Sequence, residues 1–128
     1  MRRKLFCLTA CALIALSSWA QQALFNGNDI VSPEVKNDCS VTFRLYAPKA
    51  ITVQLTGDFL SQEKNGIVNM TEGKDGVWSY TSEKLTPELY SYKFRINGMD
   101  CLDPSNIYRN RDIATYTNFF IIKEKKDD

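Results

Sequence analysis

Apolar and polar residues alternate one for one in several short segments of this chain, and this pattern constrains the fold more than any other feature. The segments 41–46, 51–56, 77–82 and 90–96 all show it. A two-residue period places one face of a strand against a core, whereas an amphipathic helix needs a period of 3.6 residues. Beyond residue 20 no sustained helical period occurs. The pattern therefore predicts β-strands that each bury one face.

Turn-forming residues separate these segments about every ten residues, as is typical of a β-sandwich. Gly57-Asp58 ends one predicted strand, and Asn97-Gly98 suits a two-residue hairpin turn because both positions tolerate positive φ. Weaker strands are expected at 67–71, 99–102 and 119–122. The fold class predicted is all-β, an immunoglobulin-like β-sandwich of seven to eight short strands.

The first twenty residues have the layout of a secretory signal peptide. Three basic residues precede the apolar run 5–16, and small residues at Ser18 and Ala20 mark a cleavage site. The run is too short to span a bilayer. We expect cleavage after Ala20 and a secreted or periplasmic mature protein. Residues 8–11 resemble a lipobox, but a lipoprotein signal ending at Cys11 would have about half the usual apolar length.

The mature chain then divides into three parts. We expect an N-terminal lead-in at 21–39, the immunoglobulin-like domain at 40–122, and a charged tail or start of a linker at 123–128. Without the three basic residues of the leader, acidic residues slightly outnumber basic ones. This balance gives no electrostatic footprint for nucleic acid. No basic amphipathic segment indicates a membrane-surface role after signal cleavage.

The chain contains no histidine, and this excludes whole classes of chemistry within it. A Ser-His-Asp or Cys-His relay cannot be built, and neither can a zinc site that uses imidazoles. No nucleophile elbow or phosphate-binding glycine loop is present. We therefore predict no catalytic residue, no cofactor and no metal ligand. Aspartates gather at predicted turns, where their side chains commonly bond nearby backbone; they are Asp58, Asp75, Asp100, Asp103 and Asp112.

Two cysteines, Cys39 and Cys101, remain after removal of the leader. An oxidising compartment allows them to form a disulfide, and two separate buried thiols are the alternative. The aromatic residues of the predicted strands are assigned to the core because they alternate with polar neighbours. Tyr46, Tyr108 and Tyr116 fall at polar-side or loop positions and are expected to be exposed.

Five motifs in fixed order resemble one family. They are Ser40–Pro48, Val53–Phe59, Gly76–Tyr80, Tyr90–Phe94, and Asn97-Gly98 followed by Asp103–Asn106. Together they resemble the early-set immunoglobulin-like domain related to carbohydrate-binding module family 48. The version they resemble most precedes the catalytic domain of bacterial secreted esterases that act on plant polysaccharides, such as feruloyl and acetylxylan esterases. The resemblance covers about residues 32–122.

The resemblance implies binding residues as well as a fold. Glycogen-binding relatives use two tryptophans, a lysine and residues before the last strand. Lys93 matches the lysine, Ile113 and Thr115 match the hydrophobic and hydroxyl contacts, and adjacent Tyr116 joins them as a candidate carbohydrate contact. Three positions differ from the family pattern: Gln62 and Asp100 stand where the tryptophans are expected, and Thr117 stands where an asparagine is expected. These differences weaken the expectation of glycogen or starch binding.

Two functions follow from the resemblance. The first is a non-catalytic accessory module of a secreted carbohydrate esterase, with a serine-hydrolase domain expected beyond Asp128. Phe120 and Tyr116 are candidates for packing against that domain. The alternative is a stand-alone polysaccharide-binding module that uses Lys93 and nearby tyrosines, with a plant polysaccharide as partner. A plain structural or adhesion domain is a third possibility, but fold alone would not produce the ordered motifs.

Overall fold

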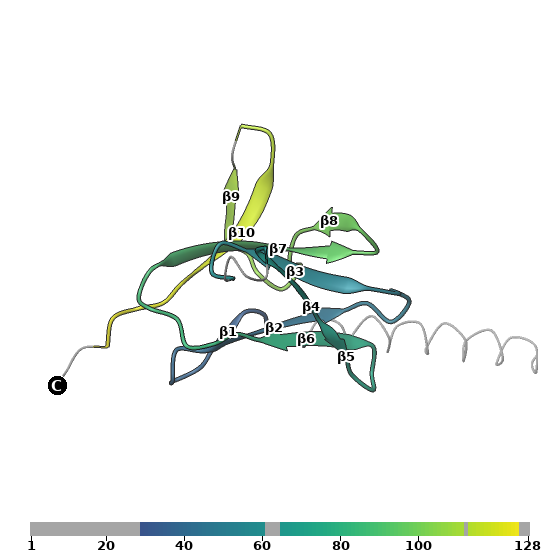
Figure 1. The fold of residues 1–128 in the computed structure, drawn as a ribbon, viewed down its shortest axis with the longest axis horizontal. Coiled ribbons are helices and arrows are strands. Elements are labelled where there is room, and N and C mark those ends of the chain that lie inside the picture. The colour runs from purple at the N-terminus through teal and green to yellow at the C-terminus, as the bar shows by residue number, and fades with distance from the viewer. Residues whose placement is uncertain (1–28, 61–64, 112, 126–128) are drawn as a thin grey trace, which may run out of the picture. The chain divides into compact units, whose positions relative to one another are not determined.

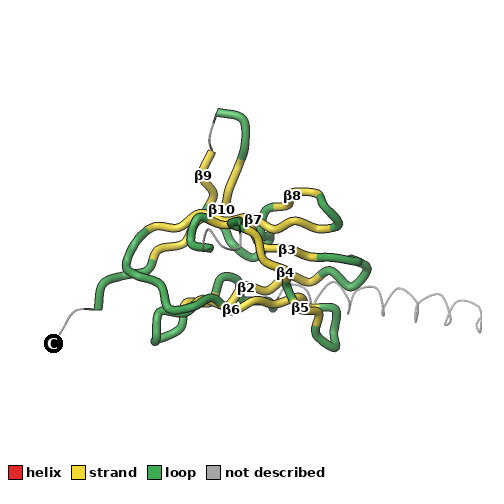
Figure 2. Tube along the Cα trace, viewed as in Figure 1, coloured by secondary structure: helices red, strands yellow, loops and turns green. Residues whose placement is uncertain are grey.

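Ten short strands form two antiparallel sheets in the part of the chain that the structure, a computed structural model, describes: residues 29–60, 65–111 and 113–125 (Figure 1). Figure 2 shows strands and loops throughout these residues, and no helix among them. The strands are β1 (Glu34–Val35), β2 (Val41–Tyr46), β3 (Val53–Gly57), β4 (Ile67–Asn69), β5 (Thr71–Glu72), β6 (Val77–Thr81), β7 (Leu89–Ile96), β8 (Met99–Cys101), β9 (Arg109–Arg111) and β10 (Tyr116–Ile121).

The two sheets are of unequal size. The four-stranded sheet has the order β1-β2-β6-β5, and the six-stranded sheet has the order β4-β3-β7-β10-β9. β8 pairs with the second half of β7, along the edge where β10 pairs with the first half. In Figure 1 the two sheets form separate layers, with β2 and β6 in one and β3, β7 and β10 in the other. The predicted all-β sandwich is confirmed.

The described residues contain more strands than the predicted seven to eight. The additional strands β1, β5 and β9 are only two or three residues long. A segment of that length contains too few residues to show a two-residue period. β9 is the clearest case, since its sequence Arg109–Arg111 has no apolar residue at all. Its place in the sheet comes from pairing with β10, where Arg111 lies opposite Tyr116.

The core lies between the sheets and is built on aromatic rings. Phe43 of β2 lies at its centre, with ring centroids 4.8 Å from Tyr92 of β7 and 5.6 Å from Phe120 of β10. Such edge-on pairs add to the stabilisation from burial alone. Tyr90 and Phe94 are also buried, which confirms the predicted inward stripe of β7. Phe120 is only 5% exposed, so its predicted role in packing against another domain is wrong.

Two predicted strands are shorter than the pattern indicated. Residues 67–71 do not form one strand, because the chain passes from the six-stranded sheet (β4) to the four-stranded sheet (β5) at Met70. The Met70 side chain is buried there, and its N–H donates to the carbonyl of Val53 at 2.8 Å. Ile51 precedes β3 and is 84% exposed. Its N–H donates to Oδ1 of Asn97, so the backbone there bonds a turn side chain.

The predicted hairpin turn is present, and one short strand lies ahead of the first predicted strand. Asn97 and Gly98 both have positive φ, at 49° and 84°, which confirms the predicted turn between β7 and β8. β1 pairs with β2, so Glu34 and Val35 of the predicted lead-in belong to the four-stranded sheet. The signal peptide predicted at 1–20, residues 21–28 and residues 126–128 lie outside the described residues.

Cys39 and Cys101 are two separate free thiols in the structure. Both are partly buried. Cys39 precedes β2 of the four-stranded sheet, whereas Cys101 ends β8 of the six-stranded sheet. The Cys101 thiol donates to the Leu102 carbonyl at 3.2 Å. Burial, and secondarily the charge of Asp103, raises the pKa of the Cys101 thiol.

Candidate functional site

The outer face of the six-stranded sheet carries the lysine that the sequence singled out. In β7 the side chains of Tyr90, Tyr92 and Phe94 are buried, so the alternate residues Ser91, Lys93 and Arg95 face away from the core. The antiparallel register then places further polar side chains on this face. Thr56 of β3 lies opposite Lys93, and Asp100 of β8 lies opposite Arg95.

A shallow hollow of about 210 Å³ lies beside Lys93 on this face. It is formed where β3, β7 and β10 run side by side, and its lining residues are Thr56, Gly57, Asp58, Ser91, Tyr92, Lys93 and Thr117. Thr117, which stands where the family pattern has asparagine, is therefore brought next to Lys93. Thr56 and Ser91 were missed by the sequence reasoning. Their outward positions on β3 and β7 were the available signal.

Asp100 restrains the lysine on the same face. The Nζ of Lys93 lies 2.9 Å from Oδ2 of Asp100, and the Nε of Arg95 lies 3.1 Å from Oδ1. The hydrogen bond from Lys93, followed by the one from Arg95, holds the pKa of the Asp100 carboxyl below its usual value. The position where the resemblance expects a tryptophan thus holds a carboxylate that partly neutralises two cations. Gln62, at the other tryptophan position, lies outside the described residues.

The remaining predicted contacts lie on the β9–β10 hairpin, which projects from the sheet in Figure 1. Ile113 and Thr115 are exposed in its loop. Tyr116 is 51% exposed, but it lies opposite Arg111 and alternates with Thr117 along β10. The Cζ atom of Arg111 lies over the Tyr116 ring, 5.7 Å from the ring centroid. Tyr116 therefore points to the opposite side of the strand from Thr117 and Lys93, and none of the three hairpin residues lines the hollow.

A second group of polar residues is buried beneath the same sheet. Asp103 is fully buried and accepts hydrogen bonds at Oδ2 from the Ser32 hydroxyl (2.6 Å) and the Tyr92 hydroxyl (2.7 Å). Its N–H donates to Oδ1 of Asn118, and Asn106 donates to the Tyr92 oxygen. Burial raises the pKa of the Asp103 carboxyl. Burial, and secondarily the Asp103 charge, raises the pKa of Tyr92.

Every member of this buried group already has its partners, because no buried side-chain polar atom among the described residues lacks a hydrogen bond. A shifted carboxyl of this kind can indicate a functional site, but it needs access to a ligand. Asp103 has none, since it is fully covered. Its contacts instead join the segment before β1, through Ser32, to β7 and β10. We therefore assign it a structural role.

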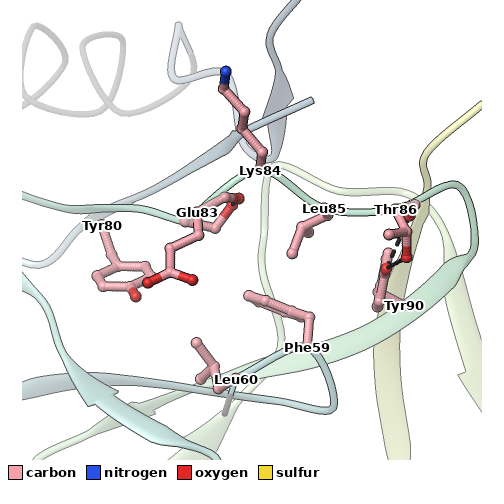
Figure 3. Close-up of a pocket in the computed structure, with 9 residues that line it drawn as sticks. Phe59, Leu60, Tyr80, Glu83, Lys84, Leu85, Thr86 and Tyr90 are labelled. Carbon is pink, nitrogen blue, oxygen red and sulfur yellow. Dashed lines mark hydrogen bonds between the residues drawn. The ribbon is translucent and has the colours of Figure 1, made fainter. Parts of the chain in front are cut away.

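A larger hollow, of about 260 Å³, opens where the loops after β3 and β6 meet (Figure 3). Its lining is mixed, and the residues are Phe59, Leu60, Tyr80, Ser82, Glu83, Lys84, Leu85, Thr86 and Tyr90. In Figure 3 the Lys84 amine points away from it. The Tyr90 hydroxyl donates to the Thr86 carbonyl at 2.9 Å, so this polar group is already engaged. Among the described residues, none of the carbohydrate contacts that the family resemblance implies lines this hollow, whereas Lys93 and Thr117 both line the hollow on the sheet face.

Within residues 29–60, 65–111 and 113–125, no three histidine, cysteine or acidic side chains are grouped so that they could hold a metal ion. The same part of the chain contains no helix of the length and hydropathy needed to cross a membrane.

Comparisons with known proteins agree with this architecture. The sequence profile of carbohydrate-binding module 48, the isoamylase N-terminal domain, matches residues 31–111. Among solved structures, similarity extends to a putative alpha amylase from Salmonella typhimurium (22% identity, TM-score 0.51, 71% of this chain and 14% of that chain). It also extends to the GBS pullulanase SAP solved with maltotetraose (19%, 0.54, 73% and 14%) and to the catalytic module of the pneumococcal glycogen-degrading virulence factor SpuA (18%, 0.56, 80% and 18%).

At these identities the structural likeness shows the fold alone, and this chain spans less than a fifth of each of those chains. The three structures are named for amylase, pullulanase and glycogen-degrading proteins, and none is named an esterase. The esterase version of the resemblance therefore stays a prediction.

Proposed function

Because the chain belongs to the carbohydrate-binding module 48 family, we propose that its domain is a non-catalytic module that binds a polysaccharide through the outer face of the six-stranded sheet. One observation carries the proposal. Lys93, which matches the lysine of the family pattern, lies beside a hollow that also has Thr56, Ser91 and Thr117 in its lining. The function thus falls closer to the binding-module alternative than to an esterase-specific role.

The chemistry of this face suits a hydroxyl-rich ligand. An ammonium group has three N–H donors, and the contact between Lys93 and Asp100 needs only one of them. The Thr56 hydroxyl donates to the Lys93 carbonyl at 3.2 Å, which leaves its oxygen able to accept from a sugar hydroxyl. Asp58 uses Oδ1 to accept the Ser91 N–H, so the backbone that forms the rim of the hollow is held in place.

The binding proposal can be tested by affinity electrophoresis of the mature chain in gels that contain glycogen or xylan. We expect at least one polysaccharide to retard the wild type, and Lys93→Ala to weaken that binding about five- to tenfold, the effect of losing one charge-assisted hydrogen bond. Lys74→Ala is the matched control, because Lys74 is exposed in the turn between β5 and β6 of the other sheet. Absence of retardation in every gel would overturn the proposal, and so would equal losses in the two variants.

We further propose that the module works as part of a larger carbohydrate-active enzyme. The similar solved structures support this, because this chain corresponds to a small share of each of them. The esterase partner, expected from the resemblance, is the finer version of the proposal. Sequencing the coding DNA beyond Asp128 tests it. An open frame that encodes a Gly-x-Ser-x-Gly elbow and a later histidine supports the esterase, whereas a frame that encodes a (β/α)₈ barrel with an acidic pair points to a glycoside hydrolase.

Export belongs to the same proposal, since the basic start and apolar run of residues 1–20 have the layout of a signal peptide. N-terminal sequencing of the protein recovered from culture medium or periplasm should begin at Gln21. A blocked, lipid-modified Cys11 would instead establish the lipoprotein alternative.

A further inference from the structure

We infer that Tyr108 and Phe119 form an aromatic platform on which a sugar ring of the bound polysaccharide stacks. The inference rests on the proposed function, because it concerns the same face of the six-stranded sheet. It identifies the apolar part of a binding surface whose polar part lies around Lys93. The two tryptophan positions of the family pattern do not supply such a ring here, since they are occupied by Gln62 and Asp100.

The position of Phe119 follows from the strand register. Its neighbours in β10, Asn118 and Phe120, are both buried, so Phe119 faces away from the core. It lies opposite Ser91 of β7, which is one of the residues that line the hollow beside Lys93. The ring therefore borders the hollow across one strand-to-strand step, a distance of about 5 Å.

Tyr108 completes the platform just before β9. Its ring centroid lies 5.5 Å from that of Phe119, with an angle of 49° between the ring planes. The Phe119 N–H donates to the Tyr108 carbonyl at 3.3 Å, which extends the β9–β10 pairing to this residue. Tyr108 is 59% exposed. A large ring that keeps most of its surface in water while resting on a second ring offers apolar area to a ligand at little cost in side-chain entropy.

The backbone of Tyr108 is held by buried side chains before any ligand arrives. Its N–H donates to Oδ1 of Asn106 at 2.9 Å, and its carbonyl accepts from Nδ2 of Asn118 at 3.1 Å. Both asparagines are buried and belong to the group around Asp103 and Tyr92. A contact surface that is already ordered loses less conformational entropy on binding. The buried polar group thus supports the platform from beneath the sheet.

The dimensions and chemistry match a sugar chain. Next to the Ser91–Phe119 pair, Asn110 lies opposite Thr117, which lines the hollow with Lys93. Residues two apart on one strand are about 7 Å apart, so the rings and the polar side chains can contact neighbouring sugar units. A sugar has an apolar C–H face and a rim of hydroxyls, and this surface offers an aromatic face beside hydroxyl, amide and ammonium groups.

Tyr116 supplies a matched control on the same hairpin. It is a tyrosine of similar exposure, 51% against 59%, but its side chain points to the opposite side of β10 from Thr117 and Phe119. Its ring carries the Arg111 guanidinium. Removing either tyrosine deletes an exposed ring from the projecting hairpin, and only Tyr108 shares a face with Lys93.

The experiment is affinity electrophoresis of the mature chain in gels of glycogen and of xylan, with the variants Tyr108→Ala, Tyr108→Leu, Tyr108→Phe, Tyr116→Ala and Lys93→Ala. With the polysaccharide that retards the wild type, we expect Tyr108→Ala and Tyr108→Leu to weaken binding about tenfold, because a flat ring is lost. Tyr108→Phe should bind like the wild type, and so should Tyr116→Ala. Thermal unfolding of each variant checks that the fold is retained, and Tyr108→Leu keeps apolar volume if Tyr108→Ala unfolds.

The outcomes separate the two proposals. Full binding by both Tyr108→Ala and Tyr108→Leu, together with weakened binding by Lys93→Ala, overturns the platform and leaves the proposed function standing. Equal losses in Tyr108→Ala and Tyr116→Ala also overturn it. A wild type that no polysaccharide retards overturns both. Gel filtration adds one further outcome: if the wild type is a dimer and Tyr108→Ala is a monomer, the platform binds a second copy of the chain and the inference is wrong.

Discussion

The domain holds two groups of polar side chains on opposite sides of one sheet. The inner group is centred on Asp103, which accepts hydrogen bonds from Ser32 and Tyr92. The outer group is centred on Asp100, which pairs with Lys93 and Arg95. In both groups one carboxylate receives two side-chain donors at 2.6–3.1 Å. They differ in burial: Asp103 is fully buried, whereas the Asp100 side chain is 47% exposed.

Burial decides what each group does. A buried donor that loses its partner finds no water to replace it, so the inner contacts contribute strongly to stability. An exposed ion pair competes with water and salt, and it contributes little. For the same reason the outer side chains can exchange their partners for a ligand, whereas the inner ones cannot. Similar chemistry therefore stabilises the fold on one side of the sheet and is open to binding on the other.

The largest expected effect is on stability. Asp103→Ala would leave the hydroxyls of Ser32 and Tyr92 and the N–H of Ser105 without their acceptor, and we expect a loss of about 3 kcal/mol in the free energy of unfolding. Asp100→Ala should cost less than about 1 kcal/mol, because that pair is screened by solvent. Urea unfolding of both variants measures the difference. Losses of equal size would show that burial does not separate the two groups.

The pH dependence should have opposite signs in the two groups. Burial raises the pKa of Asp103, so the folded state holds that proton more tightly, and its contribution is greatest below about pH 4 and is lost as the pH rises through the folded pKa. The pKa of Asp100 is lowered, so its contribution is present above about pH 4 and is lost as the pH falls through the folded value.

Urea unfolding of Asp103→Asn and Asp100→Asn, measured in steps from pH 2 to pH 7, tests these signs. In the wild type, titration of Asp103 should lower the free energy of unfolding as the pH rises above about 4, by at most about 1.4 kcal/mol per pH unit. This decline should be absent in Asp103→Asn. Asp100→Asn should reduce a smaller decline on the acid side. If the Asp103→Asn difference from the wild type does not change with pH, the buried carboxyl does not titrate differently in the folded state.

A smaller effect is expected on binding. Asp100→Ala releases Lys93 from its ion pair, so we expect binding of the retained polysaccharide to tighten about two- to fivefold. Affinity electrophoresis at low and at moderate salt measures it, and the gain should shrink as salt screens the pair. Weaker binding by this variant would mean that Asp100 positions Lys93 for the ligand.

The smallest effect concerns the two thiols, of which one precedes a strand of the four-stranded sheet and the other ends a strand of the six-stranded sheet. Because Cys39 and Cys101 are free, mass spectrometry of the unreduced protein should give the same mass as the reduced protein. Alkylation of Cys101 in the folded protein at pH 8 should be slower than that of a free cysteine, because its thiol pKa is raised. A mass two protons lower before reduction would establish the disulfide instead.

Local pattern was enough to predict most strands and much of the core. The alternation at 41–46 predicted β2 with its bounds, and Asn97-Gly98 predicted the turn before β8. The pattern at 67–71 failed, since Met70 takes the chain from one sheet to the other. One continuous strand and two short strands in different sheets can show the same alternation of apolar and polar residues. Alternation indicates which side chains are buried, but it does not indicate which strand lies alongside.

The candidate site was predicted less completely than the fold. The resemblance identified Lys93, and the structure adds Thr56, Ser91 and Thr117 from the lining of the hollow. Tyr108 and Tyr116 were both expected to be exposed, and both are. The sequence did not predict which face of the hairpin each tyrosine occupies, because the β9 segment does not alternate between apolar and polar residues.

The order of apolar and polar residues was enough to predict that this chain forms strands, where most of them lie and which of their faces are apolar, because those properties depend on neighbours two residues apart. The burial of Asp103 and the exposure of Asp100 follow from tertiary packing. Packing also places Tyr108, and not Tyr116, on the same face as Lys93. These outcomes depend on the register between strands that are distant in the chain. A shift of one residue in that register reverses the side to which every residue of a strand points.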